Sequence, residues 1–250
     1  MLARLRQTPD RVIVLLLLAW TALAVAVIVP LSFAHVAWPD ECIYLVGARN
    51  VAERGSLQTN FYLTYSLLIR GYPHRDVHMP GYILALAPFV RVFGAGMRAA
   101  VALNAAALMG SVVCLYLVGR RLIEDRLPAL TAAALLPLLP PFAGYVTVAY
   151  PEIVVTFVFL AGLAWASREG GVVHAAAAGA LFAIGALFRE TALLALPLYL
   201  LVIPRRALLR GFAPGALLTF LLVVAPLSRD RAVHPNAIYP SVLVEAQRSE

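Results

Sequence analysis

Residues 12–33 read VIVLLLLAWTALAVAVIVPLSF, an apolar run of about 22 residues that follows a short, arginine-bearing N-terminus. A membrane-spanning helix needs about 20 mainly apolar residues, so this run is long enough to cross a bilayer. A cleavable signal peptide would have a shorter apolar region and small residues at a cleavage site. Leu31-Ser32-Phe33-Ala34 fits such a site poorly. We therefore predict an uncleaved first span.

The composition of the whole chain agrees with this prediction. Hydrophobic residues make up 62% of the 250 residues and charged residues 13%, and the mean hydropathy is +0.85. Soluble domains contain fewer apolar residues and about twice as many charged ones. The composition argues against a soluble domain and predicts an all-α fold, a polytopic bundle of transmembrane helices.

Further apolar runs bring the number of predicted spans to about seven. The runs cover residues 12–33, 99–118, 128–150, 153–167, 171–188, 191–203 and 211–228. We predict a transmembrane core over residues 1–228 and a polar outer tail over residues 229–250. Within the core, a large outer loop at residues 35–97 would carry interfacial helices at 41–54 and 81–94.

The apolar run at residues 81–94 decides the topology. It is about 14 residues long and contains Arg91, which is short for a span and typical of an interfacial helix. If it does not cross the membrane, seven loop arginines share the side of the N-terminus, and only Arg189 lies in the opposite turns. The positive-inside rule then places the N-terminus in the cytoplasm. The seven are Arg120, Arg121, Arg126, Arg168, Arg205, Arg206 and Arg210.

The net charge of +7 arises from arginine alone, because all 20 basic residues are arginine. Many of them flank apolar runs, where orientation signals and anionic headgroups account for them. We therefore expect membrane lipids as partners and no nucleic acid. Cys42 and Cys114 lie in different environments and lack metal-type spacing, so we expect neither a disulfide between them nor a metal site.

Asp40 and Glu41 begin a predicted amphipathic helix shortly after the first span. Taken alone, Asp40 fits a helix N-cap better than a catalytic group, because a carboxylate there accepts backbone N–H bonds and benefits from the helix dipole. Carboxylates close to lipid, however, are costly and tend to be functional. The position of the pair near membrane depth therefore favours a functional role.

Three further side chains on the same predicted face have two interpretations each. Glu152 is the only charged residue between positions 127 and 167; it either reaches headgroup water or faces Asp40 as a second acid. His78 either belongs to an ordinary helix start or contacts a lipid phosphate, with a charge that depends on pH. Arg189 either pairs at a helix junction with Glu190 or holds a phosphate bidentately.

Taken together, these segments resemble the polyprenyl-phosphate-sugar-dependent membrane glycosyltransferases of the C superfamily, particularly the group of protein O-mannosyltransferases and the aminoarabinose transferase of lipid A. The resemblance covers almost the whole chain. Its segments, in order, are Asp40-Glu41 with the following helix, His78-Met79-Pro80-Gly81-Tyr82, the arginine-rich end of 98–121, Glu152, and Phe188-Arg189-Glu190.

The chain departs from the family pattern in three respects. Met79 replaces the first proline of the basic-Pro-Pro motif, and Pro151 precedes Glu152 where the family often has a proline after the acid. Family members usually continue with several more spans and often an outer domain. The chain thus resembles a C-terminally shortened member.

The resemblance implies transfer of a sugar from a polyprenyl-phosphate carrier to an acceptor hydroxyl, with inversion and without a cofactor, at the outer face of a bacterial plasma membrane. It implies that Asp40 is the general base, with Glu41 and Glu152 as further catalytic carboxylates. Fixed positive charge stabilises a leaving group on which negative charge grows. The candidate contacts to the lipid phosphate are His78, Tyr82, Arg98 and Arg189.

A different class of protein fits the same pattern. A non-catalytic polytopic membrane protein, such as a transporter, a lipid-binding partner of a larger enzyme or a truncated glycosyltransferase core, would also place arginine and glutamate along a substrate path. Sugar transfer from a polyprenyl-phosphate donor, measured for the chain and for Asp40→Asn, distinguishes the two classes.

Overall fold

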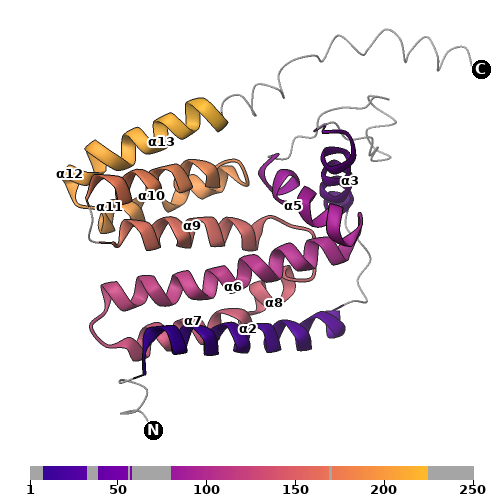
Figure 1. Ribbon diagram of the computed structural model, residues 1–250, viewed down its shortest axis with the longest axis horizontal. Helices are drawn as coiled ribbons and strands as arrows, with labels where there is room; N and C mark the ends of the chain where they lie inside the picture. Colours follow the sequence, from indigo (N-terminus) through magenta and orange to yellow (C-terminus); the bar gives the residue numbers. More distant parts are fainter. Residues whose placement is uncertain (1–7, 33–38, 56, 58–79, 169–170, 225–250) are drawn as a thin grey trace, which may run out of the picture.

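The computed structural model describes residues 8–32, 39–55, 57, 80–168 and 171–224. All regular structure in these residues is helical. The longer helices run side by side in alternating directions and form a bundle (Figure 1). The predicted all-α membrane bundle is therefore confirmed.

Three helical segments of the described residues are long and apolar enough to cross a membrane. They are α2 (Asp10–Ser32), α6 (Met97–Leu122) and a helix from Arg205 to Val224 that comprises α12 (Arg205–Ala207), η3 (Leu208–Phe212), α13 (Ala213–Thr219) and η4 (Phe220–Val224). Shorter apolar passes complete the bundle: α7 (Arg126–Leu135) with η1 (Leu136–Leu138) and α8 (Pro140–Tyr145), α9 (Glu152–Ala166), α10 (Val172–Gly185), and η2 (Glu190–Ala195) with α11 (Leu196–Val202).

The predicted span at residues 128–150 is not one helix. It divides into α7, the short η1 turn and α8, and the chain from Val146 to Pro151 is non-helical. Pro137 and Pro140 account for the first division, because proline lacks the N–H that an α-helix needs and its ring clashes with the preceding turn. The break leaves a long connection before α9.

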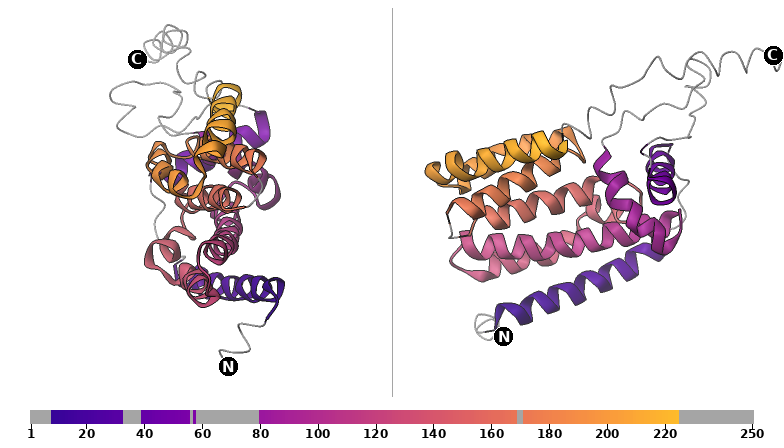
Figure 2. Two further views of the ribbon diagram at one scale, coloured as in Figure 1. Left: turned by 90° about the vertical axis from the view of Figure 1, so that its left-hand side faces the viewer. Right: turned by 45° about the horizontal axis from the view of Figure 1, so that its top comes forward.

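The bundle has two chemically different ends (Figures 1 and 2). The start of α2 lies at the same end as the connections that follow α6, α9 and α11. We call it the arginine end, since it carries Arg120, Arg121, Arg126, Arg168, Arg205, Arg206 and Arg210. The opposite, acidic end holds α3 (Pro39–Arg54), α5 (Pro80–Phe93), the α8–α9 connection and the α10–η2 connection. Which end faces the outside of the cell stays a prediction.

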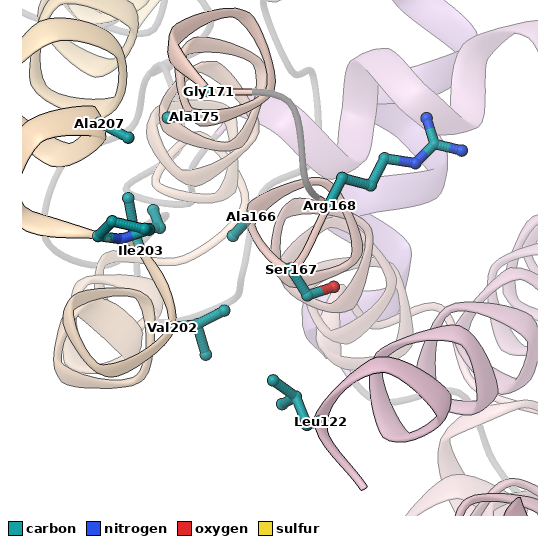
Figure 3. A pocket seen from close by; sticks show the side chains of 10 residues that line it. Leu122, Ala166, Ser167, Arg168, Gly171, Ala175, Val202, Ile203 and Ala207 are labelled. Atoms are coloured by element: carbon teal, nitrogen blue, oxygen red, sulfur yellow. The ribbon is translucent and has the colours of Figure 1, made fainter. Parts of the chain in front are cut away.

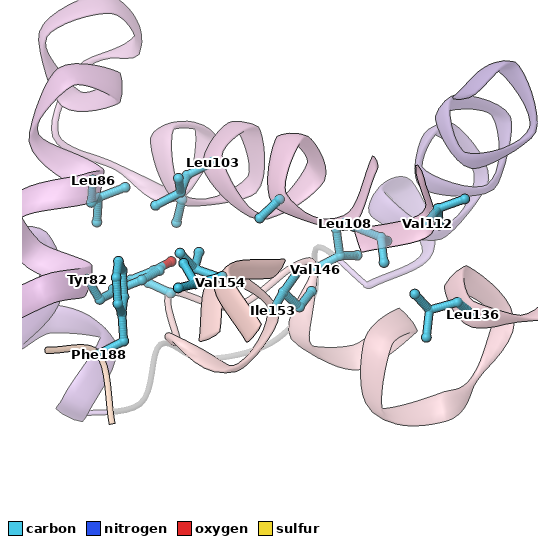
Figure 4. Close-up of a cluster of buried hydrophobic side chains, with 14 of the residues drawn as sticks. Tyr82, Leu86, Leu103, Leu108, Val112, Leu136, Val146, Ile153, Val154 and Phe188 are labelled. Carbon is cyan, nitrogen blue, oxygen red and sulfur yellow. The ribbon is translucent and has the colours of Figure 1, made fainter. Parts of the chain in front are cut away.

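The core forms around α6, which packs against α2, α5, α7 and α9. Figure 4 shows Leu103, Leu108 and Val112 of α6 opposite Ile153 and Val154 of α9, with Leu136 and Val146 beside them. Towards the acidic end this buried cluster continues to Tyr82 and Leu86 of α5 and to Phe188. A continuous core therefore links the spans to the helices of the acidic end.

α3 and α5 occupy the two segments for which the sequence predicts juxtamembrane helices, and they pack against each other. Their contact is close at Gly47, where an added Cβ would lie 2.8 Å from the Cδ1 atom of Ile83. Arg91 fastens the other end of the pair, since its Nε donates to the carbonyl oxygen of Ala52 at 3.1 Å. The two helices therefore form one unit at the acidic end.

Gly81 fastens this unit to the rest of the bundle. Its backbone N–H donates to the carbonyl oxygen of Leu187 at 2.8 Å, which joins the start of α5 to the α10–η2 connection. A Cβ at Gly81 would lie 2.6 Å from that oxygen, closer than non-bonded atoms approach. Gly81, which the sequence places at the start of a helix, therefore also makes a tertiary contact with the α10–η2 connection.

We expect Gly81→Ala to destabilise the protein by about 1–3 kcal/mol, because two backbone segments must separate to admit the methyl group. The measurement is the thermal unfolding midpoint in detergent. Gly144→Ala is the matched control, because nothing lies within 4 Å of a Cβ added there. Equal midpoints for Gly81→Ala and the parent protein would contradict the assigned contact.

Candidate active site

The acidic pair lies in the first turn of α3. The helix begins at Pro39, and proline is favoured at this position because its missing N–H has no partner in a first turn anyway. Asp40 therefore lies in the first turn, one residue after the start of the helix. The helix dipole still stabilises the negative charge of both carboxylates.

Glu41 is fully buried, with 0% of its surface exposed. Its Oε1 accepts the backbone N–H of Ala149 at 2.8 Å. Burying a carboxylate is costly unless hydrogen bonds compensate, and a charge-assisted bond to a backbone N–H is one of the stronger kinds. This bond joins α3 to the α8–α9 connection, 108 residues further along the chain. Glu41 therefore fixes the position of Asp40 relative to that connection.

Glu152 is the first residue of α9 and comes directly before its apolar run. The Nη2 atom of Arg189 donates to Oε1 of Glu152, and the two side chains form an ion pair. The pair links α9 to the α10–η2 connection. The other oxygen of the carboxylate, Oε2, is buried and has no hydrogen-bond partner among the described residues. One face of Glu152 is thus neutralised, and the other remains an unused acceptor.

The electrostatics of the acidic end place Asp40 near both Glu152 and Tyr150. Burial raises the pKa of Glu152, the positive charge of Arg189 opposes this rise, and the negative charge of Asp40 adds to it. Burial also raises the pKa of Tyr150, with further contributions from the charges of Asp40, Glu41 and Glu152. The carboxylates of α3 and α9 therefore all act on the surroundings of Tyr150. Asp40 is half-buried there.

Tyrosine rings from several elements pack against one another next to these carboxylates. Tyr44 of α3 meets Tyr82 of α5 edge to face, with ring centroids 5.0 Å apart. Tyr44 also contacts Tyr150 at 6.2 Å, and Tyr145 contacts Tyr150 at 6.1 Å. Edge-to-face pairs add stability beyond the burial of their area. The cluster fixes α3 and α5 relative to the α8–α9 connection.

Asn104 is the residue that the sequence analysis missed. It is fully buried in α6, where its Oδ1 accepts from the hydroxyl of Tyr82 at 3.2 Å. Its Nδ2 donates to the carbonyl oxygens of Tyr145 at 3.0 Å and Val148 at 2.6 Å. A lone asparagine in an apolar span was the available signal, because a polar side chain inside a membrane needs partners.

The structure brings some of the predicted site residues together and places others apart. Asp40, Glu152 and Arg189 come together, and Glu41 is buried beside them. Tyr82 has 0% exposed surface and its hydroxyl donates to Asn104, so it lies inside the bundle rather than on a surface that a ligand reaches. Arg98 is exposed in the first turn of α6. His78 lies outside the described residues.

The comparison with known families gives a match that covers the larger part of the chain. Residues 77–228 match the family described as dolichyl-phosphate-mannose-protein mannosyltransferase. This range contains Asn104, Glu152 and Arg189 and starts after the acidic pair. No curated protein and no solved structure gives a significant match. The predicted resemblance to membrane glycosyltransferases is confirmed, and because the match covers more than half of the sequence, the chain belongs to the dolichyl-phosphate-mannose-protein mannosyltransferase family.

Proposed function

We propose that the chain transfers a sugar from a polyprenyl-phosphate carrier to an acceptor hydroxyl at the acidic end of the bundle, with inversion of the anomeric carbon. The observation that carries this proposal is the convergence of Asp40, Glu152 and Arg189 from three separate segments in a member of this family. The arginine-rich loops at the opposite end support an outer position for the acidic end, under the positive-inside rule.

Asp40 is the general base of this mechanism. The acceptor oxygen forms a bond to the anomeric carbon while the bond from that carbon to the phosphate oxygen breaks, and the hydroxyl proton passes to Asp40. A single displacement of this kind inverts the anomeric carbon. Asp40 suits the role because it is half-buried, in contrast to the fully buried Glu41. A positioned carboxylate of this kind acts when it lies within hydrogen-bond reach of the hydroxyl.

Arg189 is the leading candidate to stabilise the departing phosphate. A guanidinium has five N–H donors in a planar fork, so Arg189 can keep its bond to Glu152 and still offer donors to a second anion. Its partial exposure, 43% of the side chain, leaves it accessible. Charge that grows on a leaving phosphate is where a fixed cation contributes most. Arg98 and His78 are further candidates for this contact.

The remaining carboxylates support the reaction in different ways. The unused Oε2 of Glu152 is a buried acceptor, which suits a hydrogen bond from a second donor group of the acceptor substrate, because an unsatisfied polar group gains most from a partner. Glu41 positions the site through Ala149. Tyr82 and Asn104 hold the α8–α9 connection from the side of the core, and we assign them positioning roles.

The test of the base is Asp40→Asn. We expect transfer to fall by at least about 100-fold, because the amide cannot accept the proton. The assay follows radiolabelled mannose from a polyprenyl-phosphate donor to acceptors in native membranes that contain the full chain. Glu53→Gln is the matched control, since Glu53 is an exposed carboxylate of the same helix that pairs with Arg49 at 2.8 Å.

Two outcomes of this assay would overturn the proposal. Equal transfer by the parent chain and Asp40→Asn would remove Asp40 as the base. No transfer by the parent chain would favour the non-catalytic alternative of a transporter, a lipid-binding partner or a truncated core.

The ion pair predicts a change in pH dependence. Burial raises the pKa of Glu152 and Arg189 opposes the rise, so Arg189→Gln raises this pKa further. The carboxyl group then stays protonated to a higher pH, and the acidic limb of the residual rate–pH profile moves to higher pH. Adding Glu152→Gln removes the titrating group and with it the displacement of the limb. An unchanged limb, or one displaced to lower pH, would contradict a functional Glu152 carboxylate.

A further inference from the structure

A cavity of about 260 Å³ opens at the arginine end, opposite the acidic end of the bundle (Figure 3). It lies between the ends of α6, α9 and α10 and the α11–α12 connection. Its walls are mainly apolar and its edge is polar. The apolar lining consists of Leu122, Ala166, Ala175, Val202, Ile203 and Ala207, and Ser167 and Arg168 lie at the edge.

Two guanidinium groups meet beside the edge of this cavity. Arg121 donates to the hydroxyl of Ser167 at 3.3 Å and also to the carbonyl oxygen of Ala164. Arg168 lies over the ring of Trp165, 4.7 Å from its centroid, and extends outward from the edge (Figure 3). The positive charges of Arg121 and Arg168 are close enough to disfavour each other. An anion at the edge would relieve this repulsion.

Among the residues that the structure describes, the arginines beside the cavity lack the carboxylate partners that other arginines at this end have, so their positive charge is not compensated. Arg120 and Arg126 approach Asp10 at 3.6 and 3.9 Å, so their charges are partly compensated. Arg205 and Arg206 are exposed in the first turn of α12, directly after Pro204 of the cavity edge. Within the described part of the chain, no carboxylate pairs with Arg168, Arg205 or Arg206.

The surroundings of the cavity match the depth of lipid headgroups. Trp165 is 37% exposed near the end of α9, and tryptophan is enriched where a membrane meets water. Apolar side chains next to the cavity face outward, including Leu201 at 82% and Leu122 at 56% exposure. A ligand at this place would meet arginine at one end and apolar side chains at the other.

We propose that the cavity binds an anionic phospholipid. The phosphate lies at the cavity edge beside Arg205 and Arg206, which follow Pro204, and Arg168 on the other side of the edge adds positive charge. One acyl chain enters between Leu122, Val202 and Ala207. A zwitterionic lipid fits less well, because its own ammonium group is repelled by the arginines. The site does not depend on the sugar transfer proposed for the acidic end.

Trp165 provides a local reporter for the test. The chain has three tryptophans, so Trp20→Phe with Trp38→Phe leaves Trp165 alone. The full chain is reconstituted in vesicles that contain brominated phosphatidylglycerol or brominated phosphatidylcholine at equal mole fraction. We expect phosphatidylglycerol to quench Trp165 several-fold more strongly. Replacing Arg168, Arg205 and Arg206 by glutamine abolishes the difference, whereas Arg54→Gln, an exposed arginine of α3 at the acidic end, retains it.

A second variant separates the cavity from the surface charge. Ala207→Phe keeps every arginine and fills the space between the apolar walls, so we expect the preference for phosphatidylglycerol to disappear. Equal quenching by the two lipids in the single-tryptophan chain would overturn the proposal. Survival of the preference in the triple glutamine variant would also overturn it. Survival in Ala207→Phe would show diffuse attraction to the surface and would remove the cavity as the site.

Discussion

The hydrogen bond from the backbone N–H of Ala149 to the buried carboxylate of Glu41 connects the two parts of the acidic end. One part is the α3–α5 unit, and the other is the bundle of spans that presents Glu152 and Arg189. A carboxylate in an apolar interior is stable only with good partners. Its burial therefore holds α3 in one position, and this position brings Asp40 to the start of α9.

Other contacts between the same parts follow the same rule that a polar group away from water must find a partner. Asn104 uses its amide for two carbonyl oxygens of the α8–α9 connection and for the hydroxyl of Tyr82. The N–H of Gly81 bonds to Leu187, and Arg189 pairs with Glu152. Segments distant in sequence thus meet through polar bonds, while the spans between them pack through apolar side chains.

Much of the fold could be predicted from the sequence because bilayer thickness fixes how long an apolar run must be. The gathering of the loop arginines at one end could be predicted from the positive-inside rule, once residues 81–94 were taken as an interfacial helix. The division at Pro137 and Pro140 into separate helices could not be predicted in detail, because the apolar pattern of residues 128–150 continues through both prolines. A proline-rich run indicates a kink but does not say how many helical pieces result.

The contacts of the candidate site depended on packing that a local pattern does not encode. The sequence presents Glu190 next to Arg189, yet the pairing with Glu152 arises from the way α9 and α10 lie together. Asn104 was visible as a polar residue in an apolar run, but its partners lie 22 to 44 residues away. We propose different roles for Asp40 and Glu41 because one side chain is half-buried and the other is fully buried, which the sequence does not reveal.

We propose that α3 and the α8–α9 connection share the outer face, opposite the arginine end, and thiol labelling tests this topology directly. The starting chain has Cys42 and Cys114 replaced by alanine. Arg49→Cys, Tyr145→Cys and Arg206→Cys are then introduced one at a time, and intact cells are treated with a membrane-impermeant thiol reagent. We expect labelling at positions 49 and 145 in intact cells, and at position 206 only after permeabilisation. Labelling of positions 145 and 206 from the same side, or of positions 49 and 145 from opposite sides, would contradict it.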